Sequence, residues 1–161
     1  MVNILEEDLW KIIVGNMPIS AKDLLFYSDK KGLLMGKRIN NPAKDYYFVP
    51  GGRVFKNENR DDAIKRISNH EVGLILNSNN YTSIGTYDHF YPDSIWENTK
   101  VTTHYIVEAI LILIGDEELN FNIRNQHSDL IWINESNIGK EKVHKYSMKY
   151  LSDILMFRRS L

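Results

Sequence analysis

The chain has 161 residues, a mass of 18.8 kDa and no cysteine, with 43% hydrophobic and 25% charged residues. This length fits one domain over residues 1–161, and the globular composition excludes a disordered or fibrous chain. The formal net charge of −1 argues against a broad nucleic-acid-binding surface, which needs clustered cations. Without cysteine there are no disulfide bonds and no thiolate chemistry, which agrees with a reducing compartment.

Two segments indicate where the protein resides. Residues 6–8 are acidic, whereas a signal peptide carries positive charge near its start. The most apolar stretch, residues 106–114, is too short to cross a bilayer and is interrupted by Glu108. We therefore expect a cytoplasmic protein that does not enter the membrane.

The spacing of apolar residues predicts a mixture of strands and helices. The expected elements are, in chain order, an amphipathic helix at 5–14, a hairpin of strands at 23–27 and 32–35, a strand that ends in the glycine turn at 51–52 and continues through 53–55, a helix at 59–72, strands at 83–90, 101–114 and 129–133, and a helix at 144–157. Because βαβ units do not alternate regularly, we expect an α+β fold with a mixed sheet.

The most informative motif lies in residues 52–74. Glu58 follows Gly52 after five intervening residues, and Arg66 follows Glu58 after seven. A Glu-x-Gly-apolar sequence then begins at Glu71. This spacing resembles the Nudix box, and the resemblance implies a Nudix fold, which is an α/β/α sandwich with a mixed β-sheet.

The box departs from its usual form at two positions. Ile67 stands where a glutamate normally follows the arginine, and His70 replaces one member of a glutamate pair. These departures resemble one branch of the family, the GDP-mannose mannosyl hydrolases. The likeness continues in segments 36–43, 47–54, 89–91, 102–105 and 126–127. It implies hydrolysis of GDP-mannose, or of GDP-glucose, to GDP and free hexose through attack of water on the anomeric carbon.

The resemblance also implies one Mg²⁺ ion, with Mn²⁺ as an alternative. Its ligands would be the Gly51 carbonyl, the Glu71 carboxylate and the Gln126 side chain. Taken alone, Glu71 would be interpreted as a solvated acid at a helix end, but the glycine turn and the register of the box favour a metal ligand. We assign His70 a surface or packing role, since imidazole suits a hard, oxygen-preferring cation poorly.

Five residues are candidates for catalysis. Arg38 and Arg53 resemble arginines that clamp the diphosphate with paired charge-assisted bonds. Tyr105 resembles a tyrosine that bonds the leaving phosphate, and Asp23 an acid that contacts the sugar or its arginine partner. His127 is the predicted general base, because neutral imidazole accepts a proton from water near pH 7. Each candidate also has a plain alternative. The two arginines and the histidine could be solvated surface residues, the tyrosine could be a strand residue whose hydroxyl is bonded internally, and the aspartate could belong to a turn.

Other residues are expected to support the site. His89 and His104 would orient the sugar, the phosphate or neighbouring side chains. Trp10 would help to hold the guanine through an N-terminal segment that the family exchanges between the subunits of a homodimer, whereas core packing is the plain alternative. Glu58 and Arg66 are expected to maintain the shape of the loop and helix, without a catalytic role.

Two other functions remain open. A standard Nudix pyrophosphatase would cleave a nucleotide sugar between its phosphates, and a non-catalytic Nudix-like module would bind the nucleotide sugar as a sensor. The missing acids of the box favour the sensor over the pyrophosphatase. The presence of both Glu71 and His127 argues against the sensor, so the partner we expect is a small nucleotide-sugar substrate.

Overall fold

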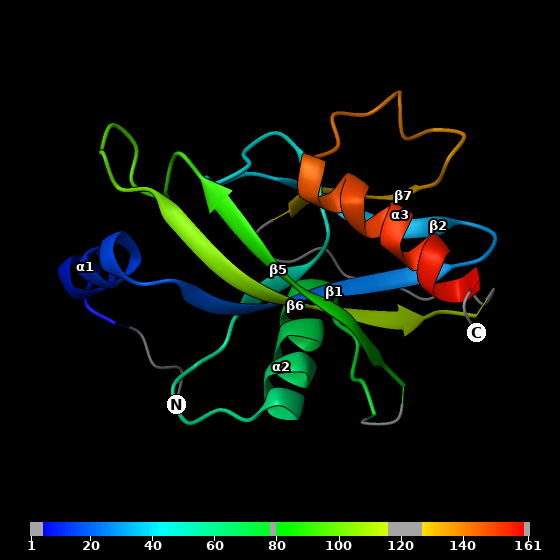
Figure 1. Ribbon diagram of the computed structural model, residues 1–161, viewed down its shortest axis with the longest axis horizontal. Coiled ribbons are helices and arrows are strands. Elements are labelled where there is room, and N and C mark those ends of the chain that lie inside the picture. Colours follow the sequence, from blue (N-terminus) through cyan, green and yellow to red (C-terminus); the bar gives the residue numbers. More distant parts are fainter. Residues whose placement is uncertain (1–4, 78–79, 116–126, 160–161) are drawn as a thin grey trace.

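A computed structural model describes residues 5–77, 80–115 and 127–159, with only the backbone at 127 and 128. Figure 1 shows a mixed sheet with α2 on one face and α3 on the other, while α1 lies beyond one end. The predicted α+β sandwich with a mixed sheet is therefore confirmed. Within the described ranges, no helix is both long and apolar enough to cross a membrane.

The central strand of the sheet is β1. The elements are α1 (Glu7–Asn16), β1 (Ile19–Ser28), β2 (Gly32–Arg38), β3 (Tyr47–Phe48), β4 (Gly51–Arg53), α2 (Arg60–Val72), β5 (Thr82–Tyr91), β6 (Thr103–Leu113), β7 (His127–Ile133) and α3 (Lys145–Arg159). The sheet order is β3-β2-β1-β6-β5, with β4 paired to β1 and β7 paired to β2. The β1–β6 pair is parallel, and the other strand pairs are antiparallel.

Local sequence explains where α2 begins and ends. The Asn59 side chain accepts a hydrogen bond from the Asp62 backbone N–H at 2.9 Å, which caps the first turn. Gly73 adopts the left-handed conformation at φ 74°, which glycine reaches without a Cβ clash, and it ends the helix. Between these caps, Ile64 and Ile67 are buried against the sheet. The helix predicted at 59–72 and its stop are confirmed.

Alternation along β1 divides the core into two parts. Leu24 and Phe26 belong to the cluster under α2, whereas Leu25 and Tyr27 belong to the cluster under α3. Successive strand residues point to opposite faces, so Asp23 shares the α3 face with Leu25 and Tyr27. The Asp23 carboxyl therefore enters the core on the α3 face of the sheet.

Two predicted connections differ in the structure. The strand expected to run through the glycine turn is two short strands, because β3 pairs with β2 while β4 pairs with β1. Pro50 lies between them and has no backbone N–H for a continuous ladder. The strand predicted at 129–133 begins two residues earlier, at His127, whose backbone lies opposite Arg38. Both differences arise because strand pairing depends on neighbours that are distant in the sequence.

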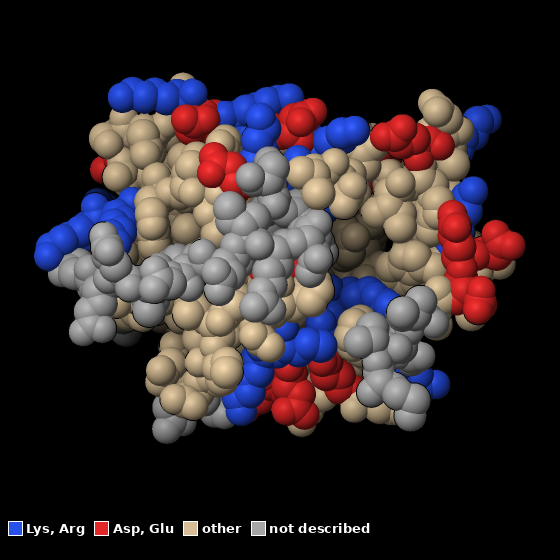
Figure 2. All heavy atoms as spheres, turned by 180° about the vertical axis from the view of Figure 1, so that it is seen from behind, with Lys and Arg blue, Asp and Glu red and all other residues tan. Residues whose placement is uncertain are grey.

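Charges of both signs are interspersed on one face of the molecule. On the face drawn in Figure 2, lysine and arginine side chains alternate with acidic ones, and basic side chains border a hollow. This distribution agrees with the net charge of −1 and is better suited to a small anion than to an extended polyanion.

Candidate active site

A cavity of about 300 Å³ opens on the α3 face of the sheet. Strands β1 to β6 all contribute to its walls, together with a loop at residues 40–42. The predicted residues that line it are Asp23, Arg38, Gly51, Arg53, His89 and Tyr105. The fold thus gathers, in one cavity, candidates that lie up to 82 positions apart in the chain.

The Asp23 carboxyl is the most deeply buried acid of this cavity. Its side chain accepts a hydrogen bond from the Tyr150 hydroxyl at 2.7 Å, and the residue is 6% exposed. Burial raises the pKa of Asp23 from 3.8 to about 7, while the bond from Tyr150 and the charge of Arg38 lower it in part. A carboxyl with this pKa can hold or release a proton near neutrality.

His89 lies beside Asp23 in an aromatic setting. Its ring stacks on Tyr146 with a centroid distance of 3.8 Å and an interplanar angle of 4°, and Phe48 approaches edge-on at 6.0 Å. Burial, followed by the charge of the nearby His144, lowers the pKa of His89 to about 4. The imidazole is therefore neutral at pH 7, which suits it to exchange hydrogen bonds without carrying charge.

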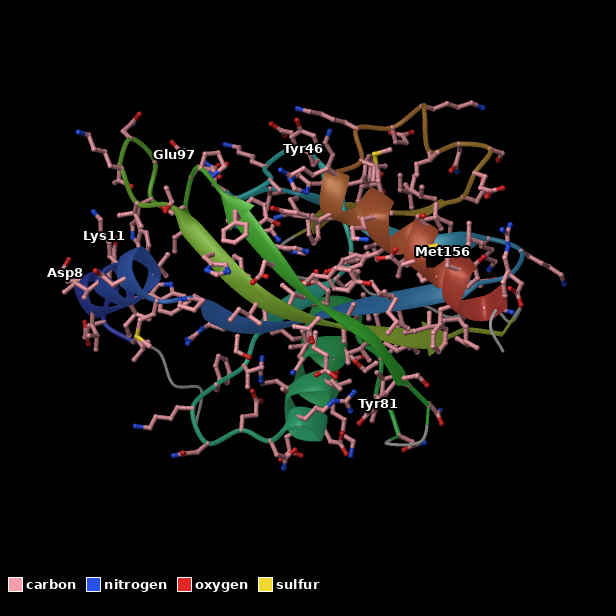
Figure 3. All side chains as sticks on the ribbon, viewed as in Figure 1. Asp8, Lys11, Tyr46, Tyr81, Glu97 and Met156 are labelled. Atoms are coloured by element: carbon pink, nitrogen blue, oxygen red, sulfur yellow. The ribbon has the colours of Figure 1, made fainter. Side chains whose placement is uncertain are left out.

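A second imidazole completes this aromatic cluster. His144 contacts Tyr46 edge-on at 5.3 Å and Tyr91 at 5.5 Å, and Figure 3 shows Tyr46 beside the beginning of α3. Burial, followed by the charges of Lys145 and Arg38, lowers the pKa of His144 to about 4. Phe48, His89 and Tyr91 line the cavity, so the cluster forms an aromatic part of its wall.

Arg38 and Tyr105 face the cavity from different strands. The Arg38 Nε donates to the Pro42 carbonyl at 2.8 Å, which anchors the guanidinium at the loop edge. Burial raises the pKa of the Tyr105 hydroxyl, and the charges of Arg38 and Arg53 oppose that rise. The phenol therefore stays protonated at neutral pH and can donate to an anionic oxygen.

Arg53 is held between two aromatic rings. Its guanidinium carbon lies 4.6 Å from the Trp10 centroid and 4.7 Å from the Phe55 centroid. Both distances are within the range of cation–π attraction. In this chain Trp10 thus covers an arginine of its own cavity, a contact between segments that are distant in the sequence. Burial and the charge of Arg66 lower the pKa of Arg53.

Glu58 and Arg66 brace the loop against α2. Two guanidinium nitrogens of Arg66 donate to the two Glu58 oxygens at 2.6 and 2.8 Å, and one also donates to the Arg53 carbonyl at 2.8 Å. The Glu58 carboxylate in turn accepts from the Phe55 backbone N–H at 2.9 Å. This bidentate pair lies outside the cavity lining, as a structural role requires.

The glycine turn needs two residues without a Cβ. A Cβ at Gly51 would collide with the Asp23 carboxyl oxygen and lie 2.9 Å from the Lys22 carbonyl. A Cβ at Gly52 would lie 3.3 Å from the Ile67 side chain. Glycine here allows close approach of the turn to both its neighbours, and both glycines line the cavity.

The oxygen donors near this turn fit a magnesium ion. Glu71 is 2% exposed and lies one turn after Ile67, which packs on Gly52, so both side chains share the helix face toward the turn. Mg²⁺ needs only one or two carboxylates and keeps several waters. The described residues contain no cluster of three acidic, histidine or cysteine ligands. The predicted ligand Gln126 lies outside the described residues.

The remaining predicted residues separate into two groups. His127 lies opposite Arg38 across the β2–β7 pair, which places its backbone near the cavity, but its side chain is outside the described part. His104 lies on the opposite face of β6 from Tyr105, with its Nε2 3.1 Å from Asp88 and its ring stacked on Phe90 at 4.3 Å. Strand alternation turns His104 away from the cavity, so the prediction that it contacts the substrate is not supported.

The architecture and the site define an α+β domain with a glycine turn, a braced loop and helix, and an arginine-bearing cavity. Residues 18–153 match the NUDIX domain, and the chain belongs to the Nudix family. The chain is 35% identical over 145 residues to the low-salt glycan biosynthesis protein Agl8 of Haloferax volcanii, covering 90% of this chain and 87% of that protein.

Solved structures of low sequence identity share the fold. The Nudix domain of Shewanella oneidensis NrtR, solved with ADP ribose, has a TM-score of 0.68 at 12% identity and covers 94% of this chain and 98% of that one. A bifunctional NMN adenylyltransferase/ADP ribose pyrophosphatase from Francisella tularensis has a TM-score of 0.69 at 22% identity. That match covers 93% of this chain, which spans only 44% of the larger protein.

Proposed function

We propose that the protein hydrolyses GDP-mannose, with GDP-glucose as a second substrate, to GDP and free hexose in a reaction that depends on Mg²⁺ or Mn²⁺. One observation carries the proposal. Arg38, Arg53 and Tyr105 converge in one cavity with Asp23 and His89. Arginines and a phenol suit a diphosphate, whereas a carboxyl and a neutral imidazole suit the hydroxyls of a sugar.

The substrate class has independent support. The relative that is 35% identical bears a name in glycan biosynthesis, a process that consumes activated sugars. A structural neighbour was solved with ADP ribose, in which a diphosphate also joins a nucleoside to a sugar. Preference for GDP-mannose itself rests on the sequence resemblance to the mannosyl hydrolase branch.

The proposed roles follow from chemistry. Arg38 and Arg53 hold the diphosphate, and Tyr105 donates a hydrogen bond to the phosphate oxygen that departs. The Gly51 carbonyl, Glu71 and Gln126 would hold the divalent ion. When bound, this ion neutralises charge on the diphosphate and improves GDP as a leaving group.

Water activation is assigned to His127, whose neutral imidazole would remove a proton as the oxygen attacks the anomeric carbon. Inverting glycoside hydrolysis ordinarily needs both an acid and a base. GDP departs without protonation once its charge is covered, so one base is sufficient. Asp23 and His89 would position the hexose within the cavity.

Assembly as a cytoplasmic homodimer is also part of the proposal. Leu9, Ile12 and Met17, on α1 and just after it, are 48%, 61% and 60% exposed, which offers an apolar surface to a second copy. Light scattering on a size-exclusion column measures the assembly directly. A monomer at working concentration would refute this part without affecting the chemistry.

Hydrolysis in ¹⁸O-water tests the chemistry. We expect the label on the hexose C1 hydroxyl, with none in GDP, when a panel of GDP- and UDP-sugars is incubated with Mg²⁺ and the products are analysed by mass spectrometry. Label in a phosphate product would identify a standard pyrophosphatase. Tight binding of a nucleotide sugar without turnover would identify the sensor.

A further inference from the structure

A tyrosine of α3 joins two residues of the cavity. Tyr150 is fully buried, and its hydroxyl oxygen lies 2.7 Å from Asp23 Oδ2 and 3.2 Å from His89 Nε2. The three groups come from α3, β1 and β5 and form a continuous hydrogen-bonded chain. Tyr150 does not line the cavity itself, so it acts on a ligand only through these two neighbours.

The hydroxyl has one proton and can donate to one neighbour only. A carboxylate is the stronger acceptor and lies closer, so the proton belongs on the bond to Asp23. The contact with His89 can then be a hydrogen bond only if the imidazole donates from Nε2. We propose that Tyr150 is a positioning residue, which holds the Asp23 carboxylate and keeps His89 in the tautomer with its proton on Nε2.

Neighbouring contacts prevent the imidazole from turning away. Tyr146, one helical turn before Tyr150, stacks on His89 with nearly parallel rings. The Tyr146 hydroxyl accepts from the Phe90 backbone N–H at 2.8 Å and donates to the Phe90 carbonyl at 3.1 Å. Helix α3 therefore fixes both the plane of the imidazole, through Tyr146, and its protonated nitrogen, through Tyr150.

The consequence for the site rests on the proposed function. With Nε2 protonated, Nδ1 of His89 keeps its lone pair and lies 4.0 Å from Asp23 Oδ2, too far for a bond between them. Imidazole and carboxylate then present two adjacent acceptors. Such a pair suits hydroxyl donors on neighbouring carbons of a hexose, so Tyr150 would align the sugar for attack.

The spectroscopic test does not depend on activity. In Tyr150→Phe the ring remains but the acceptor for Nε2–H is lost, so the Nδ1–H tautomer of His89 should increase roughly 3- to 10-fold relative to Nε2–H, the equivalent of one hydrogen bond. Long-range ¹H–¹⁵N spectra at one pH, well above neutrality, measure the tautomers. An unchanged His89 spectrum would overturn the proposal.

A matched control lies in the same interface. Tyr87 donates to Asp153 at 2.8 Å, and its ring contacts that of Tyr150 edge-on at 5.0 Å. Tyr87→Phe removes an equivalent hydroxyl–carboxylate bond outside the cavity and should leave His89 unchanged. If the control alters the tautomer as much as Tyr150→Phe, the effect is general loosening of α3 and the proposal is wrong.

A second variant serves if Tyr150→Phe does not fold. In Asp23→Asn the amide accepts more weakly, so the hydroxyl is released to donate to His89 and the Nδ1–H tautomer should again increase. An unchanged tautomer in this variant would also contradict the proposal, because the hydroxyl would then not be shared between the two residues.

Kinetic measurements test whether the hydrogen-bonded chain of Tyr150, Asp23 and His89 contributes to the reaction. Tyr150→Phe should lower kcat for GDP-mannose roughly 10- to 100-fold with KM changed less than about 3-fold, because misalignment acts mainly on the transition state. Tyr87→Phe should retain kcat. Equal kcat in wild type and Tyr150→Phe overturns the alignment role. If wild type hydrolyses no nucleotide sugar while the tautomer still responds to Tyr150→Phe, the proposed function fails and the hydrogen-bonded chain stands.

Discussion

The two faces of the sheet carry different chemistry. Under α2 most of the buried side chains are apolar, and Ser68 and Glu71 are the buried polar residues of that helix. The apolar cluster consists of Leu24, Phe26, Leu34, Ile64, Ile67, Val72, Leu76, Ile110 and Ile112. Under α3 the core is rich in tyrosine, and Asp23, His89 and Tyr150 are buried together beside the cavity. Both faces are built by the same strands, so alternate residues of one strand serve different purposes.

This difference indicates how stability and function are divided. Apolar burial under α2 stabilises the fold without regard to ionisation. Burial under α3 removes water from ionisable groups, which raises the pKa of Asp23 and lowers that of His89. Such groups destabilise the folded state when they are charged. We infer that apolar burial under α2 offsets the free-energy cost of the reactive site under α3.

The largest expected effect concerns a functional residue on the α2 face, which otherwise contributes to stability. Glu71 is a buried acid on α2, at the edge of the apolar face. Glu71→Gln should lower Mg²⁺-dependent turnover roughly 10³-fold or more, because a bound divalent ion contributes several kcal/mol to catalysis. The thermal unfolding temperature of the variant should stay close to that of wild type. Calorimetric Mg²⁺ titration with kinetics measures this, and Glu97→Gln at an exposed surface acid is the control. Full activity in Glu71→Gln, or in excess chelator, would refute the metal site.

The second prediction concerns the general base. His127→Gln keeps a polar side chain but removes the base, so kcat should fall roughly 10²–10⁴-fold while substrate and Mg²⁺ affinities change little. The acid limb of the kcat–pH profile should flatten in the variant, because only neutral imidazole accepts the proton. Near-normal kcat with an unchanged acid limb would place the base elsewhere, with His89 the next candidate because it lines the cavity.

The third prediction sharpens the assignment of stability to the α2 face. Ile64 is fully buried there, so Ile64→Ala should lower the free energy of unfolding by about 2–5 kcal/mol. Well below the melting temperature, kcat/KM should remain near wild type. Urea unfolding and kinetics measure the two quantities. Ile75→Ala, at a position 84% exposed, should change stability by less than about 0.5 kcal/mol.

The fourth prediction concerns the diphosphate. Arg38→Lys keeps the positive charge but loses the planar fork, so transition-state binding should weaken by about 1–3 kcal/mol. The ratio of kcat/KM values gives this quantity. Arg158→Lys, at an exposed ion pair with Asp29, is the control and should have no effect. Wild-type kinetics in Arg38→Lys would show that Arg38 does not clamp the ligand.

The smallest effect tests the destabilising character of the α3 face. Since the pKa of Asp23 is raised to about 7 in the folded state, its stabilising contribution is full below pH 4 and is lost as the pH rises through 7. Asp23→Asn should therefore gain stability over wild type as the pH rises, by roughly 2 kcal/mol between pH 5 and pH 7, because the wild-type carboxyl must lose its proton while it is buried.

Thermal unfolding of both proteins between pH 5 and 8 measures the difference. His89 and His144 have lowered pKa values and lose stability as the pH falls below 6.5, but this contribution is common to both proteins and largely cancels. A difference that does not depend on pH would mean that burial does not perturb the Asp23 carboxyl.

Much of this organisation could be predicted from the sequence. The pattern of apolar residues predicted every helix and most strands, because the helical spacing that ends at Gly73 and the apolar run within β1 are local signals. The resemblance to the Nudix box predicted that Glu58 and Arg66 maintain the shape of the loop and helix, and the two side chains form an ion pair in the structure. Resemblance to a known branch identified Asp23 and its companions in the cavity wall, although their individual roles stay predictions.

Other features depended on tertiary packing. His104 and Tyr105 are adjacent in sequence, yet the register of β6 directs only Tyr105 into the cavity. In the sequence, Tyr150 resembles any other aromatic residue of a helix. Only the packing of α3 on the sheet brings its hydroxyl to Asp23, which lies 127 positions earlier. Trp10 gave no local sign that it would cover Arg53.

The sequence by itself determined the elements, their caps and the family, because each depends on residues within a few positions of one another or on a motif of known spacing. Tertiary structure alone decided which side chains share a cavity, to which acceptor the Tyr150 hydroxyl donates and how far the Asp23 carboxyl is removed from water. These properties arise from contacts between distant segments, and hydrogen bonding and desolvation act only after the segments have packed together.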